Sequence, residues 1–534
     1  MTVKCRYPNR LLLLLRMCMG METSNTDSFW LILKKRLLSD KFFVALTVFV
    51  AVLSYGFAIT NFSMGVDDPA AHHYLYTDGW GSMIQQGRLL HLLLNGLTGL
   101  IRFIPFFNDF LAVTLFVFSA WVLCALFQYI THGRLSPKSL ALFSCIYLSY
   151  SIINEKFIYN LDVITTMISY LCFAFALLYS YQFVYEHRKI ALLYAVLNIL
   201  ISISSYESFI FLYVGGVFFI FILKLLVNED KVRFKELILK GLLFAAILTL
   251  AFVLYYSLVY ALQMLTDQYG VFVRNSIWNS TEGHWRILKK TVKQILKDML
   301  QFSYLPILIF DLFSAIGFFL FALFAVKRKS LVLFLCFGGM FASNFFIHLI
   351  TGFVMYRAAQ TFCFFVAAVA LMFMFALERT NIRIVRNTAY ALAAFLVLLQ
   401  AADLNRWFYN DYSRYKKEEF AVNAIATRLV AECDVSKPVV FTNRDDASYL
   451  YSTDAGGQVN GRSMLMWGVG AFRDTQSPML IEIFKLHGYT FIQTPTAEQV
   501  QEAKEKSKTM PAWPKKESIM EFEEYIVVNF SEAG

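Results

Sequence analysis

Two adjacent carboxylates, Asp67 and Asp68, stand in a Val-Asp-Asp-Pro stretch directly after the first long apolar run of the chain. Carboxylates at the mouth of a membrane-spanning helix are costly to hold beside lipid, which makes them candidates for function. A positioned carboxylate can take the proton from a hydroxyl group that attacks a sugar carbon. The alternative is a plain loop turn, because Asp-Asp-Pro is also favourable turn chemistry.

Two arginines are placed where they can hold a phosphate. Arg88 follows Gly87 in the same loop as the acidic pair, and Arg357 lies at the end of a later apolar run. A guanidinium group presents parallel N–H donors that match phosphate oxygens. The alternative is that each side chain only extends from a helix end into water.

An acidic side chain also interrupts an apolar region at Tyr206-Glu207-Ser208, where one apolar run gives way to the next. An acid buried at a span end is a functional candidate by default, whereas the same acid in an ordinary loop is not. Tyr206 and Glu207 are therefore candidate donor- or acceptor-binding residues. Another short loop is expected to line the same cavity through Glu155, Lys156 and Asp162.

Other chemistries find less support. His72 and His73 lie near the acidic pair, so a divalent metal is an alternative, but paired histidines beside an acidic turn are more often ordinary loop polarity. We therefore favour no metal and no certain cofactor. The eight cysteines show neither metal-ligand spacing nor a disulfide framework. Nucleotide-binding and hydrolase motifs are missing in any fitting context.

The elements that carry these residues must lie in a membrane. Of the 534 residues, 58% are hydrophobic and only 16% are charged, whereas a soluble domain carries about 25% charged residues. The net charge of +10 does not indicate nucleic-acid binding, because Lys and Arg cluster in short loops between apolar runs, as the positive-inside rule predicts.

The apolar runs predict about eleven transmembrane helices. They lie at 41–60, 109–130, 138–153, 163–184, 190–205, 208–227, 238–262, 305–326, 331–351, 358–377 and 388–404.

Loop charge predicts the topology and the domains. With the basic loops in the cytoplasm, residues 1–40 are also cytoplasmic. The loops that alternate with the basic ones then face out. Residues 41–404 form the transmembrane domain, whose outer loops 61–108 and 263–304 each contain a half-apolar or basic amphipathic segment. For the second segment, contact with lipid phosphates and a plain solvated helix face are alternatives. Residues 405–534 have a soluble composition and predict a small outer α/β domain.

Taken in order, these features resemble the membrane O-antigen glucosyltransferases of the Gtr type II group, within the GT-C class. The likeness rests on the basic N-terminus and first span before Asp67-Asp68, on Gly87-Arg88, on Tyr206-Glu207-Ser208 and on the exit from the last span, residues 405–415. As an architecture it covers most of the chain.

The resemblance implies a GT-C-like helical bundle in the bacterial inner membrane, with a periplasmic C-terminal domain. It implies an inverting enzyme that moves a sugar, usually glucose, from a polyprenyl phosphate to lipopolysaccharide O-antigen or a related glycan. Asp67 or Asp68 would be the base and Arg88 would hold the donor phosphate; for Arg357 only its position supports that role. A lipid phosphate donor needs no nucleotide-binding motif.

Two other classes stay open. A transporter or flippase for a lipid-linked glycan would place charge along a pathway and often shows internal repeats, but the charges here gather at span ends and the sequence shows no repeat. Another lipid-dependent transferase, for mannose or arabinose, would use the same loop chemistry.

Overall fold

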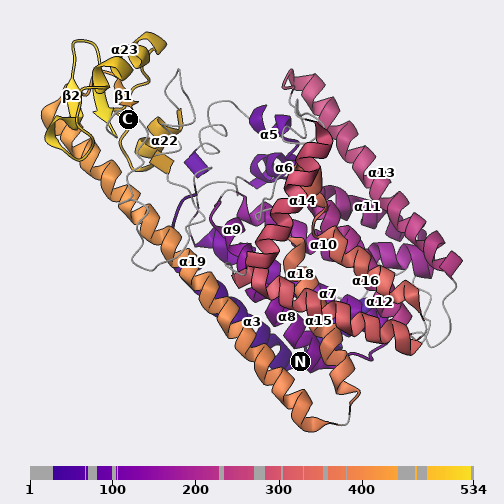
Figure 1. The fold of residues 1–534 in the computed structure, drawn as a ribbon. Coiled ribbons are helices and arrows are strands. Elements are labelled where there is room, and N and C mark those ends of the chain that lie inside the picture. Colours follow the sequence, from indigo (N-terminus) through magenta and orange to yellow (C-terminus); the bar gives the residue numbers. More distant parts are fainter. Residues whose placement is uncertain are drawn as a thin grey trace, which may run out of the picture.

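The protein is a helical bundle with a small sheet near its C-terminus (Figure 1). The computed structural model describes residues 28–65, 68–69, 81–98, 104, 106–160, 162–227, 234–269, 283–301, 305–328, 330–352, 359–380, 382–442, 464–465 and 478–530.

The elements are numbered as in Figure 1. The N-terminal half contains α2 (Phe29–Ile32), η1 (Leu33–Leu37), α3 (Lys41–Thr60), α5 (Gly81–Gln85), α6 (Leu89–Thr98), α7 (Phe107–Ile130), α8 (Pro137–Ser149), η2 (Ser151–Ile153), α9 (Asn154–Phe157), α10 (Val163–Glu186), α11 (Lys189–Ile203), α12 (Phe209–Val227) and α13 (Phe234–Thr266). The remainder contains α14 (His284–Gln301), α15 (Leu305–Arg328), α16 (Leu331–Ser343), α17 (Phe346–Thr351), α18 (Thr361–Glu378), α19 (Arg383–Glu432), β1 (Val439–Thr442), α22 (Pro478–Leu486), α23 (Ala497–Ser507), η5 (Lys516–Ser518), β2 (Ile519–Glu521) and β3 (Ile526–Asn529).

Eight of the described helices are long and apolar enough to cross a membrane: α3, α7, α10, α12, α13, α15, α18 and α19. The expected helical fold with a small C-terminal sheet is thereby confirmed, and these eight helices agree with a polytopic membrane protein. The three other expected spans fall on α8, α11 and α16, which have 13, 15 and 13 residues. At about 1.5 Å per residue these helices are shorter than the roughly 30 Å of a bilayer core.

Helix ends are fixed by local side chains. Asp40 caps α3 by accepting hydrogen bonds from the backbone N–H groups of Phe42 and Phe43, and Ser136 caps α8 ahead of Pro137 at the first helical position. Both are standard ways to satisfy the free N–H groups of a helix start. Inside the bundle, polar groups pair across helices, as in the hydrogen bond from Tyr55 to the Leu148 carbonyl at 2.6 Å.

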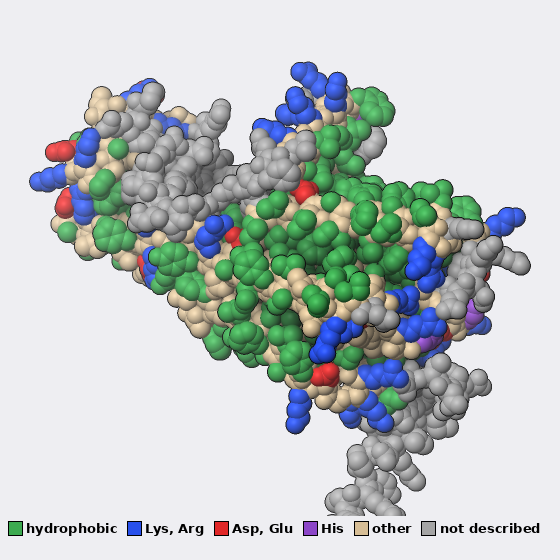
Figure 2. All heavy atoms as spheres, turned by 60° about the horizontal axis from the view of Figure 1, so that its bottom comes forward, with side chains coloured by type: hydrophobic (Ala, Val, Ile, Leu, Met, Phe, Trp, Pro, Cys, Tyr) green, Lys and Arg blue, Asp and Glu red, His purple; other side chains and the backbone are tan. Residues whose placement is uncertain are grey.

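The core of the bundle is rich in Phe and Tyr, and α7, α10, α12 and α18 are its most buried spans. The face of the bundle shown in Figure 2 is broadly hydrophobic, with Lys and Arg gathered mainly toward its edges. This distribution suits helices surrounded by lipid.

The longest helix is α19, with 50 residues. It packs along α3 and continues without a break past residue 404, where the transmembrane domain was expected to end, into the C-terminal region (Figure 1). There a three-stranded sheet has the order β1-β3-β2, with β1 and β3 parallel and β2 antiparallel to β3. Helices α19 and α22 pack on this sheet to form a separate apolar core.

Candidate functional site

One short segment joins two groups of polar side chains at the same end of the bundle. This segment comprises α9, residues 158–160 and Asp162, and we call it the site loop. Asn160 on it contacts the acidic turn, by which we mean residues 63–65 and Asp68, and Asp162 contacts Arg88. Residues that are far apart in the sequence are thereby brought to one place.

Asp68 holds the acidic turn together. Its Oδ2 accepts hydrogen bonds from the Gly65 backbone N–H at 2.8 Å and from Asn160 Nδ2 at 3.2 Å. Asn160 Nδ2 also donates to the Ser63 carbonyl at 2.6 Å. With Asp68 only 1% exposed, these bonds stabilise a buried carboxylate and tie the turn to the site loop.

The close approach of these two segments requires a glycine at position 65. A Cβ atom on Gly65 would lie 2.9 Å from the Tyr159 ring and 3.0 Å from the Ile158 carbonyl oxygen. From the other side, the fully buried Arg414 of α19 donates from Nη2 to the Met64 carbonyl. The acidic turn is therefore fixed between the site loop and α19.

The second group centres on an ion pair between Arg88 and Asp162. Arg88 Nη1 lies 2.9 Å and 3.1 Å from the two carboxylate oxygens of Asp162, and both side chains are about a quarter exposed, at 26% and 29%. His91 Nε2 lies 2.8 Å from the same carboxylate, and Thr165 Oγ1 lies 2.9 Å from that nitrogen. Because both described hydrogen bonds of Arg88 use Nη1, the guanidinium has further N–H donors that no described residue occupies.

Gly87 shapes the backbone before Arg88. Its φ of +68° lies in the left-handed region that favours glycine. Its carbonyl oxygen accepts a hydrogen bond from the Tyr255 hydroxyl of α13 at 3.0 Å. The Gly-Arg pair that the sequence singled out is thus a turn locked against a neighbouring helix.

The charges of this group are set by burial and by one another. Burial alone would raise the pKa of Asp162, but Arg88, His91 and Lys156 lower it below its usual range, so the carboxylate is ionised at neutral pH. Burial lowers the pKa of His91, against the opposing effect of Asp162, so the imidazole is neutral at pH 7. The result is a charged pair supported by a neutral histidine.

Tyr206 and Glu207 lie beside this pair, in the turn between α11 and α12. Lys156 Nζ stands 3.9 Å above the Tyr206 ring, a cation–π contact. Burial raises the pKa of Glu207, while Arg88 and a hydrogen bond from Tyr255 act in the opposite direction. Tyr206 and Glu207 in turn raise the pKa of Arg88, which places all three groups within electrostatic reach.

A small polar pocket, with room for roughly one water molecule, lies beside the acidic turn. It is lined by Ala58, Asn61, Ser63, Asp109, Phe157, Ile158, Asn160 and Phe408. Asp109, in the first turn of α7, is only 5% exposed, and its Oδ1 has no hydrogen-bond partner among the described residues. This carboxylate therefore faces a pocket without a described neutralising group.

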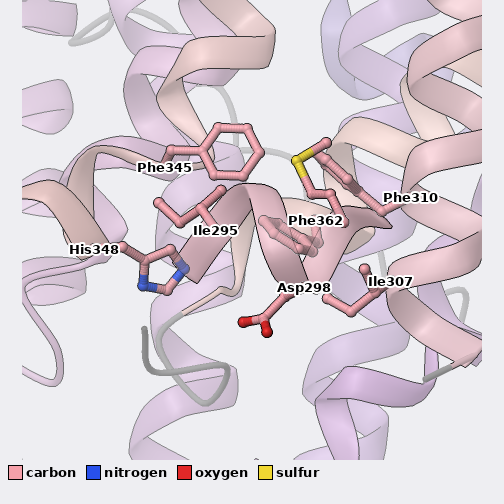
Figure 3. A pocket seen from close by; sticks show the side chains of 8 residues that line it. Ile295, Asp298, Ile307, Phe310, Phe345, His348 and Phe362 are labelled. Atoms are coloured by element: carbon pink, nitrogen blue, oxygen red, sulfur yellow. The ribbon is translucent and has the colours of Figure 1, made fainter. Parts of the chain in front are cut away.

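A second small pocket lies beside the amphipathic helix α14 and is of a different kind (Figure 3). Its lining is mostly apolar, with Asp298 and His348 as the polar members. Side chains from α14, α15 and α18 point into it, among them Ile295, Phe310 and Phe362. It offers apolar surface and few hydrogen-bonding groups.

The structure brings four of the six predicted site residues to one end of the bundle: Asp68, Arg88, Tyr206 and Glu207. Asp67 and Arg357 lie outside the described residues, as do His72 and His73. Over the described parts of the chain, no three His, Cys, Asp or Glu side chains are grouped so that they could hold a metal ion.

Sequence reasoning did not single out His91, Thr165, Tyr255 or Asp109. His91 follows Arg88 by three residues, the spacing that puts both on one helix face, so a signal was present. Asp109 was counted as the first residue of a span, although an acid at such a position is itself a functional signal. Nothing in the sequence pairs Tyr255 with Gly87, because that contact depends on how α13 packs.

Fold and site together define a polytopic membrane protein with a cluster of charged and aromatic side chains at the ends of its spans. The family described as "Glucosyl transferase GtrII" matches residues 56–402, which is more than half of the chain and includes the site loop and its partners. The chain therefore belongs to the GtrII glucosyl transferase family. No curated protein matches the sequence.

Proposed function

We propose that this glucosyltransferase takes glucose from a polyprenyl phosphate and transfers it, with inversion at the sugar carbon, to O-antigen of lipopolysaccharide or a related surface glycan. The end of the bundle that carries the site faces the periplasm of the bacterial inner membrane, with the N-terminus in the cytoplasm. The observation that supports this most is the Arg88 group, a cation with unused donors beside the half-buried acids Asp162 and Glu207 at the span ends.

Arg88 and Lys156 bind the phosphate of the donor in this proposal. Asp162 holds the Arg88 guanidinium through Nη1 and so directs its remaining N–H groups. Lys156 is only 7% exposed and is held over Tyr206. A lipid-linked phosphate reaches such a site from the bilayer, which agrees with the absence of a nucleotide-binding motif.

The acidic turn supplies the base. The oxygen of an acceptor hydroxyl attacks the anomeric carbon, its proton passes to a carboxylate, and the bond from that carbon to the phosphate oxygen breaks. Polyprenyl phosphate leaves with the electron pair. Asp68 is buried and accepts two described hydrogen bonds, which suits a positioning residue, so we assign the base to Asp67.

Sugar transfer in membranes that contain the protein tests this proposal. The donor is radiolabelled polyprenyl-phosphate-glucose and the acceptor is lipopolysaccharide, with Asp67→Asn and Asp68→Asn compared separately with wild type. We expect Asp67→Asn to lower transfer by about 100-fold or more, because a general base contributes roughly 10²–10⁴-fold. Asp68→Asn should lower folding stability as well as transfer.

The outcomes separate the parts of the proposal. Transfer from another polyprenyl-linked sugar but not from glucose would keep the mechanism and change the donor. Loss of transfer in Asp68→Asn alone, with normal insertion and stability, would move the base to Asp68. Full activity in both variants would show that the acidic turn is only structural.

A further inference from the structure

The side chain that the proposed reaction leaves unexplained is His91. It lies in the first turn of α6, where its backbone N–H donates to the Arg88 carbonyl at 3.1 Å. The ring is only 1% exposed, whereas the side chains of Arg88 and Asp162 are each about a quarter exposed. Because the imidazole is closed off from the surface, it acts on a ligand only through the residues that it contacts.

The contacts of His91 fix which ring nitrogen carries the proton. Nε2 lies 2.8 Å from Asp162 Oδ1 and 2.9 Å from Thr165 Oγ1. An ionised carboxylate only accepts hydrogen bonds. The Thr165 hydroxyl donates its one proton to the backbone carbonyl of Asp162 at 2.8 Å, so it also presents a lone pair to His91. Both partners therefore require an N–H on Nε2, and the neutral ring is the Nε2–H tautomer.

This donor sets the orientation of the carboxylate that holds Arg88. Asp162 Oδ1 meets both His91 Nε2 and Arg88 Nη1, and Oδ2 meets Arg88 Nη1 again. Rotation of the Asp162 side chain therefore breaks its bond to His91. The direction of the other guanidinium N–H groups depends on that carboxylate, because Arg88 is held through Nη1. As an uncharged donor, His91 orients Asp162 without adding a charge that would compete with Arg88.

We propose that His91 is a positioning residue for the donor phosphate. Its Nε2–H holds the Asp162 carboxylate so that Arg88 presents its remaining N–H groups to the phosphate of the lipid-linked sugar. The inference rests on the proposed function, in which Arg88 binds that phosphate. What position 91 must supply is an N–H donor at the place of Nε2, and the ring itself is not required.

Binding of polyprenyl phosphate to the purified full-length protein in nanodiscs tests this role without requiring transfer. His91→Gln places an amide N–H close to the position of Nε2, whereas the shorter side chain of His91→Asn does not reach Asp162. We expect His91→Asn to raise the dissociation constant about 10-fold, near the lower end of the range for a hydrogen bond to a charged group. His91→Gln should bind as wild type does.

The matched control is His348→Asn, which also removes an imidazole that is 1% exposed, but from α17. It should leave the affinity for polyprenyl phosphate unchanged. A second measurement repeats His91→Asn in an Arg88→Gln background. Because His91 acts through Arg88, the substitution should weaken binding no further there, so the two losses do not add.

Three results would overturn the positioning role: unchanged binding in His91→Asn, an equal loss in His91→Gln and His91→Asn, or the same loss from His91→Asn with and without Arg88. The last two are what a purely structural role produces. Equal affinity of wild type and Arg88→Gln for polyprenyl phosphate would instead contradict the proposed phosphate site itself. The two failures are therefore distinct.

Discussion

The fold shifts the protonation equilibrium of Glu207. Burial raises its pKa above the ordinary 4.5, although Arg88 and a hydrogen bond from Tyr255 act to lower it. A neutral glutamic acid next to Arg88 leaves the cation free to bind phosphate, whereas an ionised one competes for it. The charge of this one side chain therefore tunes the proposed phosphate site.

Glu207→Gln should change how stability depends on pH. The folded protein binds the Glu207 proton more tightly than the unfolded chain does, so stability falls as the pH rises from 4.5 toward the raised pKa. Glutamine cannot ionise, so the variant should lose this part of the decline. Thermal unfolding in detergent between pH 4 and 8 measures it.

The matched control for this measurement is Glu505→Gln, which changes an exposed glutamate of α23. It should follow the wild-type pH profile. A Glu207→Gln profile that coincides with wild type throughout would show that Glu207 is ionised in the fold at the same pH as in the unfolded chain.

Single residues also show which parts of the site can be predicted from the sequence alone. Arg88, Tyr206 and Glu207 were predictable because polar groups in apolar surroundings stand out without any structure. The partners Asp162 and Lys156 were placed at the same cavity for that reason too. The hydrogen bonds from Tyr255 to Gly87 and from Arg414 to Met64 were not predictable, because each joins segments more than 160 residues apart.

Among the elements, α14 has a surface that indicates where it lies. Trp285, Val292 and Leu296 are exposed at 83%, 40% and 53% and follow one stripe of the helix. Exposed lysines, among them Lys289 and Lys293, line the next stripe, while the opposite face packs on α15 and α17. An apolar stripe beside a cationic one is typical of a helix at the lipid–water boundary.

We therefore expect Trp285 to be quenched by brominated lipids in vesicles that contain phosphatidylglycerol. The Trp285 signal is obtained by subtracting the fluorescence of Trp285→Phe, because the chain has eight tryptophans. Reversing Lys289 and Lys293 to Glu should reduce the quenching, since each lysine near an anionic surface contributes about 1 kcal/mol. Lys504→Glu on α23 is the control, and an unquenched Trp285 would place α14 in water.

The ends of the helices show what amino-acid composition does not predict. The long apolar runs predicted the eight longest spans because hydrophobicity reports directly on lipid contact. Three apolar runs extend past the ends of the helices they predicted: 138–153 for α8, 190–205 for α11 and 331–351 for α16. The reason is that apolar residues continue into turns packed inside the bundle. The change of composition at Asn405 does not coincide with a helix end, since α19 continues through it.

For the molecule as a whole, the buried Arg414 makes the contacts that join α19 to the acidic turn. Its Nη1 pairs with Glu418 at 2.5 Å, and Nη2 holds the Met64 carbonyl at the start of the acidic turn. All of Arg414 and Glu418 is buried. One side chain thus connects α19, the core of the C-terminal region and the turn that carries the proposed base.

Arg414→Leu should destabilise the protein by about 3–5 kcal/mol, because it removes the cation that compensates the buried charge of Glu418. Transfer should be lost even in protein that still inserts into membranes. Denaturant unfolding and the transfer assay measure the two effects. Lys416→Leu, which breaks an exposed pair with Glu419 on the same helix, should cost only about 0–1 kcal/mol; an equally small cost for Arg414→Leu would contradict the role of this contact.

The unbroken course of α19 has a mechanical consequence. With 50 residues, the helix is a rod about 75 Å long, seated against α3 at one end and against the sheet at the other. Tilting such a lever by roughly 5° displaces its far tip by about 6 Å. Arg414, which donates a hydrogen bond to the Met64 carbonyl, lies partway along this helix. Any movement of the C-terminal region relative to the bilayer therefore also shifts the acidic turn.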